Sequence, residues 1–180
     1  MRLFIAINFN ENIKRKLQEI IEGLRKESKK GSFSRIENLH LTLAFLGEIE
    51  VERINNLKVI MDEIEAEPFQ IELSHLGAFN RKGSSESIYW CGIKQNKILY
   101  NVQEKLVAML KENNFYLDDK PFKPHITLAR RCVLPKDFSL DNFNRLIVDD
   151  SMVVNEISLM KSERINGILT YTEIYKKNIQ

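Results

Sequence analysis

Hydrophobic residues recur along this chain with two different periods, which together predict a mixture of strands and helices. A continuous apolar run indicates a buried strand over residues 2–8. Asn10 follows as a suitable N-cap, because its side chain can accept a hydrogen bond from the first turn of a helix. The expected helix has one apolar stripe, formed by Ile13, Leu17, Ile20, Ile21 and Leu24. Helical spacing also covers residues 51–64, 99–110 and, more weakly, 137–146.

Strand-like runs occupy much of the remaining chain. They cover residues 39–46, 69–79, 88–93 and 125–132, with others around 152–160 and 169–175 and a short segment at Phe33. The runs 69–79 and 88–93 are expected to form a hairpin. Hairpins interleaved with helices indicate an α+β fold rather than a doubly wound sheet. Because no linker interrupts the 180 residues, we expect a single domain spanning residues 1–180.

One four-residue pattern occurs twice on predicted strands and contains two of the three histidines in the chain. His40-Leu41-Thr42-Leu43 returns as His125-Ile126-Thr127-Leu128. Successive side chains of a strand point to opposite faces, so each pattern puts its histidine and threonine on one face and its aliphatic residues on the other. Both copies also lie between helices, which suggests an internal duplication. A pseudo-twofold axis would then place the two histidines opposite each other across a cleft.

Two facing imidazoles have the chemistry needed for displacement at phosphorus. One group must deprotonate the incoming oxygen and another must protonate the leaving oxygen. An imidazole with a pKa of about 6.5 can do either at neutral pH. Thr42 and Thr127 could donate hydrogen bonds to non-bridging phosphate oxygens as charge accumulates. We therefore expect His40, His125, Thr42 and Thr127 to be catalytic.

Other nucleophile and cofactor signatures are missing from the sequence. There is no His-x-x-x-His, no paired-cysteine spacing, no Gly-x-Ser-x-Gly elbow and no phosphate-binding glycine loop. We therefore expect neither a metal nor a cofactor. Cys91 and Cys132 are expected to be reduced thiols, and His75, which has no partner pattern, is expected to be structural.

The charge balance of +2 is too even for a protein that holds nucleic acid by a broad basic surface, so any such contact should be local. A basic cluster flanks the second pattern and favours attraction of an anion there. It consists of Lys120, Lys123, Arg130, Arg131 and Lys136. Without a secretory core or a membrane-length apolar stretch, we expect a cytoplasmic protein that does not contact membranes.

With these residues in view, the chain resembles the 2H phosphoesterase superfamily, and most closely the RNA 2′,3′-cyclic phosphodiesterases, also called 2′-5′ RNA ligases. The resemblance rests on segments 2–7, 37–48, 90–92 and 122–130. It implies a bilobal, duplicated fold in which two antiparallel sheets line a central cleft with helices outside. It also implies that His40 is the general acid on the leaving 3′ oxygen and His125 the base that activates water. A 2′,3′-cyclic end would open to a 2′-phosphate, and an RNA hydroxyl in place of water would give 2′-5′ ligation.

The resemblance also suggests substrate contacts, with some departures. Phe33 stands where the family usually has tryptophan, and residues 85–88 replace a common Pro-Arg element before Trp90. Phe33 and Trp90 could stack on a base, although an aromatic residue in a strand is more often part of the core. The resemblance favours Arg130 as the phosphate or substrate contact, whereas strict alternation from His125 favours Arg131.

The expected partner is RNA with 2′,3′-cyclic phosphate ends, tRNA fragments among the candidates, and the protein is expected to be a monomer. Two alternatives stay open. The scaffold could bind RNA ends without turnover, or it could hydrolyse a small cyclic or 2′-5′ linked nucleotide.

Overall fold

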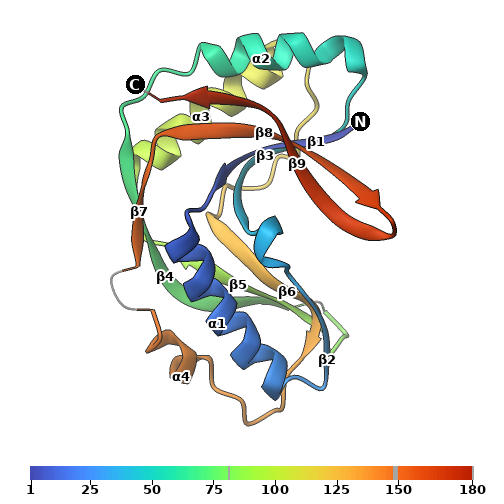
Figure 1. Ribbon diagram of the computed structural model, residues 1–180, viewed down its shortest axis with the longest axis vertical. Coiled ribbons are helices and arrows are strands. Elements are labelled where there is room, and N and C mark those ends of the chain that lie inside the picture. The colour runs from blue at the N-terminus through green and yellow to red at the C-terminus, as the bar shows by residue number, and fades with distance from the viewer. Residues whose placement is uncertain (81, 148–149, 180) are drawn as a thin grey trace.

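The computed structural model describes residues 1–80, 82–147 and 150–179, which form two lobes, each built on an antiparallel sheet (Figure 1). The first lobe contains the sheet ordered β3 (His40–Glu48), β1 (Arg2–Asn8), β8 (Glu156–Ile165) and β9 (Ile168–Asn178). The second lobe contains the sheet ordered β2 (Lys30–Phe33), β6 (His125–Val133), β5 (Ser87–Ile93), β4 (Phe69–Asn80) and β7 (Ser151–Val154). The predicted α+β class with two antiparallel sheets is confirmed.

The two sheets repeat one arrangement of strands. The order β3-β1-β8-β9 of the first lobe corresponds to β6-β5-β4-β7 of the second, with β2 added outside β6. In both lobes the strand that carries the His-x-Thr-x pattern pairs with a strand followed directly by a long helix, α1 (Glu11–Glu27) after β1 and α3 (Lys97–Glu112) after β5. The duplication expected from the repeated pattern is therefore visible in the topology.

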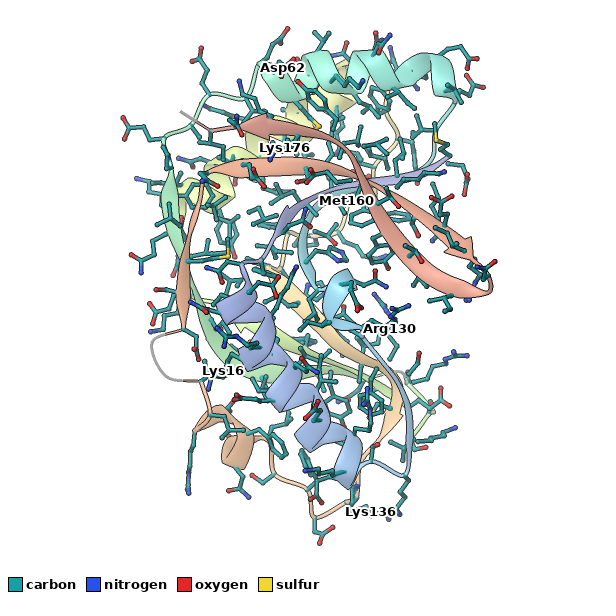
Figure 2. The ribbon with its side chains drawn as sticks, in the orientation of Figure 1. Lys16, Asp62, Arg130, Lys136, Met160 and Lys176 are labelled. Atoms are coloured by element: carbon teal, nitrogen blue, oxygen red, sulfur yellow. The ribbon has the colours of Figure 1, made fainter. Side chains whose placement is uncertain are left out.

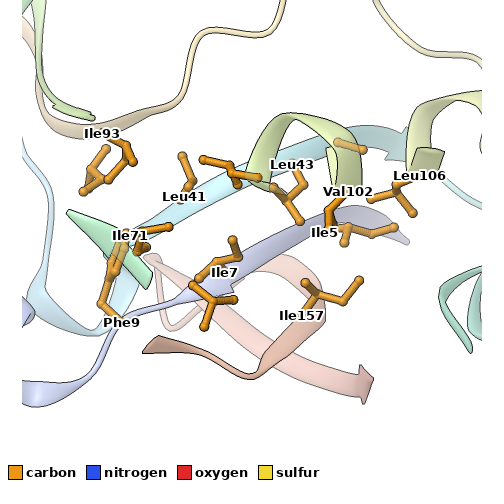
Figure 3. Packing of buried hydrophobic residues seen from close by; sticks show 14 of the residues in the cluster. Ile5, Ile7, Phe9, Leu41, Leu43, Ile71, Ile93, Val102, Leu106 and Ile157 are labelled. Atoms are coloured by element: carbon orange, nitrogen blue, oxygen red, sulfur yellow. The ribbon is translucent and has the colours of Figure 1, made fainter. Parts of the chain in front are cut away.

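The helices cover the outer faces of the sheets and bury their apolar stripes (Figure 1). The N-cap expected for α1 is present, because Asn10 Oδ1 accepts a hydrogen bond from the Ile13 amide at 3.0 Å. In the first lobe, Leu41 and Leu43 lie next to Ile5 and Ile7 and face α3 (Figure 3). Since the aliphatic residues of the pattern are buried in this core, its histidine and threonine are turned toward the opposite face.

Three predicted elements differ from the structure. The strand expected over residues 152–160 is two strands, β7 and β8, which separate at Asn155 and join different sheets. The helix expected over 51–64 is a 3₁₀ turn, η2 (Val51–Arg53), followed by α2 (Ile54–Asp62). The weak helix over 137–146 is reduced to α4 (Leu140–Asn144), whose N-cap residue Ser139 makes no capping hydrogen bond.

Two further expectations concern cysteines and membrane segments. Cys91 and Cys132 are buried and free, as predicted. Within the described ranges, no helix combines the length and hydrophobicity needed to cross a lipid bilayer.

Candidate active site

A β-bulge occurs at the same place in both motif strands. Along the β1–β3 pair, Ala6 lies opposite Thr42 and Ile5 opposite Ala44, so Leu43 is an extra residue. The β5–β6 pair skips the equivalent residue of the second pattern, Leu128. An extra residue shifts the alternation of side chains by one. The fifth residue after each histidine therefore returns to the histidine's face of the sheet.

The bulge decides which arginine faces the site. Arg130 is the fifth residue after His125, lines the same cavity, and has its Nη2 3.4 Å from Thr127 Oγ1. Arg131 adopts a left-handed backbone with φ of +48° and does not line the cavity. Strict alternation, which favoured Arg131, was therefore wrong, because it assumed a strand without a bulge.

Each histidine makes the same kind of hydrogen bond, from its ring to the backbone two residues earlier. His40 Nδ1 lies 2.7 Å from the carbonyl oxygen of Asn38, and His125 Nδ1 lies 2.6 Å from that of Lys123. A carbonyl oxygen only accepts hydrogen bonds, so each Nδ1 donates its proton to the backbone. The Nε2 atom of each ring is then the atom that gains or loses a proton. For His40 this atom lies 3.0 Å from the hydroxyl of Thr42.

The two histidines have different surroundings. The His40 ring lies between Phe4, 4.7 Å away between ring centres, and Tyr171, 5.2 Å away. Burial in this setting lowers the pKa of His40, and the positive charges of Arg130 and His125 lower it further, against the opposing effect of the Asn38 carbonyl. His125 is more exposed and meets the edges of Phe79 and Trp90.

Asn38 connects the first motif strand to the C-terminal hairpin. This residue ends the 3₁₀ helix η1 (Ile36–Asn38), and its side-chain amide donates to the Leu169 carbonyl at 2.9 Å. Its Oδ1 accepts from the Tyr171 amide at 3.3 Å. The same residue therefore fixes the tautomer of His40 through its carbonyl and positions Tyr171 against that ring.

The motif residues line one cavity of about 970 Å³ between the lobes. Its wall includes six predicted site residues and a further set of cations. The predicted residues are Phe33, His40, Thr42, His125, Thr127 and Arg130. The other cations are Arg2, Arg35, Lys161 and Arg164. In Figure 2, Arg130 lies in the space between the β8–β9 hairpin and β2, whereas Lys136 lies at the far end of the second lobe.

The basic cluster predicted around the second pattern is not a single surface. Of its members only Arg130 lines the cavity, and Lys120 instead makes an exposed ion pair with Asp118 at 2.5 Å. The cavity's other positive charges come from distant parts of the chain. Sequence proximity to His125 was therefore a poor guide, because a strand and its flanking loops direct neighbouring side chains to different faces.

The two predicted aromatic contacts have different locations. Phe33 lines the cavity, packs against the main core, and has the Arg25 guanidinium 5.1 Å from its ring centre. Trp90 lies opposite Thr127 on β5 but is outside the residues that line the cavity.

Sequence reasoning missed the aromatic residues of the first lobe. Phe45 is 50% exposed in the cavity wall, and the Arg2 guanidinium lies 5.1 Å from its ring centre. Phe45 is the fifth residue after His40, so the bulge gives it the position that Arg130 has in the second lobe. Tyr171 comes from the C-terminal hairpin, and no motif in the sequence indicated it.

Among the described residues, no cluster of three or more histidine, cysteine, aspartate or glutamate side chains is arranged to hold a metal ion. The polar groups that line the cavity are instead suited to an anion, because they are mostly cations, hydroxyls and imidazoles.

Comparison with known proteins identifies the family. The family described as LigT like Phosphoesterase matches residues 7–89. An RNA 2′,3′-cyclic phosphodiesterase from Thermotoga maritima is 33% identical over 179 residues, which cover 98% of this chain and 92% of that protein. This chain belongs to the LigT-like phosphoesterase family. It is therefore an enzyme of the phosphoesterase class.

Solved structures agree with the fold of this phosphoesterase. Escherichia coli LigT in its apo form is 28% identical, with a TM-score of 0.81 over 99% of this chain and 96% of that one. The same protein complexed with 3′-AMP is 27% identical, with a TM-score of 0.79 over 99% and 97%. The family match at residues 7–89 contains only the first motif strand, whereas these structures also span the second.

Proposed function

We propose that this phosphoesterase hydrolyses RNA 2′,3′-cyclic phosphodiester ends to 2′-phosphomonoesters. The observation that carries the proposal is the convergence of His40 and His125, with their two threonines and Arg130, on a single cation-lined cavity. The name of the Thermotoga maritima relative supports this substrate class, and the 3′-AMP complex of E. coli LigT supports a cavity that accepts a nucleotide.

His125 Nε2 acts as the base in the proposed step. It takes a proton from water as the water oxygen forms a bond to phosphorus. The bond from phosphorus to the 3′ oxygen breaks on the opposite side, and His40 Nε2 gives its proton to that oxygen. The products are a 2′-phosphate and a 3′-hydroxyl. The hydrogen bonds from both Nδ1 atoms to backbone carbonyls support these roles, because they leave each Nε2 available for proton transfer.

The bound phosphate helps to supply the acid form of His40. In the free enzyme, burial and two nearby positive charges favour neutral His40 by lowering its pKa. A phosphodiester between the two histidines brings a negative charge that favours the protonated ring. Substrate binding therefore promotes the protonation state that the leaving oxygen needs.

Arg130 and the threonines supply hydrogen bonds to the non-bridging oxygens. Arg130 is exposed in the cavity, and its guanidinium is close enough to Thr127 Oγ1 for both to reach one phosphate. A fixed guanidinium is suited to two phosphate oxygens at once. Phe45, half-exposed in the cavity wall on the first-lobe side, is suited to contact the base of the substrate nucleoside.

Product analysis tests the proposal directly. A cyclic-phosphate oligonucleotide and a 2′,3′-cyclic mononucleotide are incubated with the enzyme and a chelator, and the ends are separated as 2′- or 3′-phosphates. We expect 2′-phosphate ends, and we expect His40→Ala or His125→Ala to remove nearly all turnover. Exclusive 3′-phosphate products, or a folded variant with wild-type turnover, would contradict the mechanism. Tight binding of the end without turnover would favour the end-binding alternative.

A further inference from the structure

One wall of the cavity continues past His40 along the same face of the first sheet. Phe4 of β1 packs against the His40 ring, with 4.7 Å between the ring centres. Arg2 is two residues earlier on this strand, so its side chain points to the same face, about 6.6 Å farther along. Arg2 lines the cavity, and its guanidinium lies 5.1 Å from the ring centre of Phe45. The wall therefore carries a cation beyond the imidazole of the proposed acid.

The β8–β9 hairpin extends this wall and brings a second arginine to it. The pairing of β8 with β1 reaches only to Lys161, whereas its pairing with β9 continues to Ile165. The hairpin therefore projects past the end of β1 (Figure 1). Arg164 lies on the projecting part and lines the cavity. Its Nη1 donates a hydrogen bond to the Gly167 carbonyl at 2.8 Å, which holds the guanidinium at the hairpin end of the cavity.

Ion pairing distinguishes these two arginines from the other cations of the cavity. Lys161 and Arg35 each lie close to a neighbouring glutamate carboxylate, at 2.7 and 3.3 Å. Arg130 is assigned to the phosphate that reacts. Among the residues that the structure describes, neither Arg2 nor Arg164 makes an ion pair with a carboxylate, and both are exposed. A guanidinium of this kind can bind a phosphate without first giving up an acidic partner, so the cavity has positive charge available for a second anion.

We propose that Arg2 and Arg164 bind the phosphodiester that links the reacting nucleoside to the preceding nucleotide of an RNA chain. This inference rests on the proposed function, in which His40 faces the 3′ oxygen of the terminal ribose. The 5′ carbon belongs to the same ribose, so the phosphate on it lies one sugar away from the reacting phosphorus. The first-lobe wall that carries both arginines also carries Phe45, the proposed contact of the base. The wall therefore follows the 5′ side of the terminal nucleotide, while Arg130 holds its cyclic end.

The surface beyond Arg164 favours an RNA chain over a single nucleotide with a 5′-phosphate. Around the hairpin turn, Ile165, Ile168 and Leu169 are 47%, 49% and 38% exposed, and Leu169 lines the cavity. Exposed apolar residues rimmed by polar ones are typical of binding surfaces. The ribose and base of a preceding nucleotide would cover these residues, whereas a 5′-phosphate monoester would end at the arginines. The cavity, at about 970 Å³, is also at the upper end of the range of about 300–1,000 Å³ for small-ligand sites.

Three substrates with the same cyclic end test the second phosphate. The 5′ carbon carries no phosphate in 2′,3′-cyclic AMP, a monoester in its 5′-phosphorylated form, and a diester in the dinucleotide ApA with a 2′,3′-cyclic end. We expect kcat/KM to be higher for the dinucleotide than for 2′,3′-cyclic AMP. Arg2→Gln and Arg164→Gln should each lower this ratio about 3- to 10-fold, an effect between those of an exposed ion pair and a charged hydrogen bond. Arg2→Lys, which keeps the charge, should restore part of the ratio.

A matched control and the salt dependence separate phosphate binding from a structural effect. Arg145→Gln removes the charge of an exposed arginine outside the cavity and should leave the ratio unchanged. For the wild type, log(kcat/KM) should fall more steeply with log[salt] for the dinucleotide than for 2′,3′-cyclic AMP. The difference in slope should be at most about 0.7, the value for one phosphate of a single strand, and Arg2→Gln and Arg164→Gln should each reduce it. A variant that only disturbs packing would leave this difference in place.

Calorimetry with the reaction products measures binding without turnover. We expect ApA with a terminal 2′-phosphate to bind more tightly than adenosine 2′-phosphate, and to lose this advantage in Arg2→Gln and Arg164→Gln. Equal binding of the two products, or a ratio of kcat/KM that neither variant lowers, would overturn the proposal. A preference for the 5′-monoester that the dinucleotide does not share would also overturn it, because the arginines would then serve a single nucleotide. Tighter, arginine-dependent binding of the dinucleotide product without any hydrolysis would instead refute the proposed function and keep the second phosphate site.

Discussion

Removing the two histidines one at a time should leave enzymes with opposite pH dependence. In His125→Ala the remaining titrating group of the pair is His40, the proposed acid, so kcat/KM should fall as pH rises. In His40→Ala the remaining group is His125, the proposed base, so kcat/KM should rise with pH. The wild type combines both limbs into a bell whose apparent pKa values belong to the coupled pair.

The loss of rate and the midpoint of each pH profile can both be estimated. Each lost proton transfer should lower the rate about 10²- to 10⁴-fold, which is about 2.7 to 5.4 kcal/mol at 1.36 kcal/mol per decade. Because burial lowers the pKa of His40, the falling limb of His125→Ala should have its midpoint below the ordinary imidazole value. Loss of the His125 charge removes one of the smaller effects that lower the pKa of His40, and the largest effect, burial, stays in place.

The assay is the initial rate of 2′,3′-cyclic AMP hydrolysis from pH 5 to 9 at substrate concentrations well below KM. Circular dichroism and thermal unfolding verify that each variant is folded, which matters most for His40→Ala because its ring packs between Phe4 and Tyr171. A rate that rises with pH in His125→Ala would mean that His40 is the base and that the assigned roles are reversed. Flat profiles in both variants would refute acid–base catalysis by this pair.

Three further predictions concern the same site. Arg130→Gln should lower kcat/KM about 10- to 150-fold, the range for losing a charged hydrogen bond. It should also move the limb of the pH profile that reports on His40 to higher pH, because the Arg130 charge lowers the pKa of His40. The neighbouring Arg131→Gln is the control and should change kcat/KM by less than about threefold. Folding lowers the pKa of His40, so as pH falls the unfolded chain takes up a proton on this residue at a higher pH than the folded protein does. The folded protein should therefore lose stability as pH falls below about 6.5. The thermal unfolding midpoint of the wild type should drop more between pH 7 and 5 than that of His40→Gln. Excess EDTA should leave turnover of the cyclic phosphate unchanged, and recovery of lost activity by an added divalent cation would contradict a mechanism based on two imidazoles.

Most helices and strands could be predicted, because the sequence pattern that indicates each of them lies within the element itself. The apolar stripe and N-cap of α1 lie within one helix, and the repeated pattern lies within two strands. The bulges were not predictable in this way, because nothing in the alternation of residues 125–132 reveals that Leu128 is skipped by its partner strand. That single residue decides between Arg130 and Arg131. Tyr171 was missed for another reason, since its place beside His40 depends on a hairpin 131 residues away and on the side chain of Asn38.

The proposed mechanism gives the two copies of the pattern different roles, and the structure gives them different surroundings. Both histidines share the Nδ1 hydrogen bond, the neighbouring threonine and the bulge, so the pattern itself makes them equivalent. In-line displacement needs two different groups, one that holds a proton and one that accepts it. The structure does show a difference that comes from outside the pattern, because the His40 ring packs between Phe4 and Tyr171, whereas the His125 ring meets Phe79 of the second lobe.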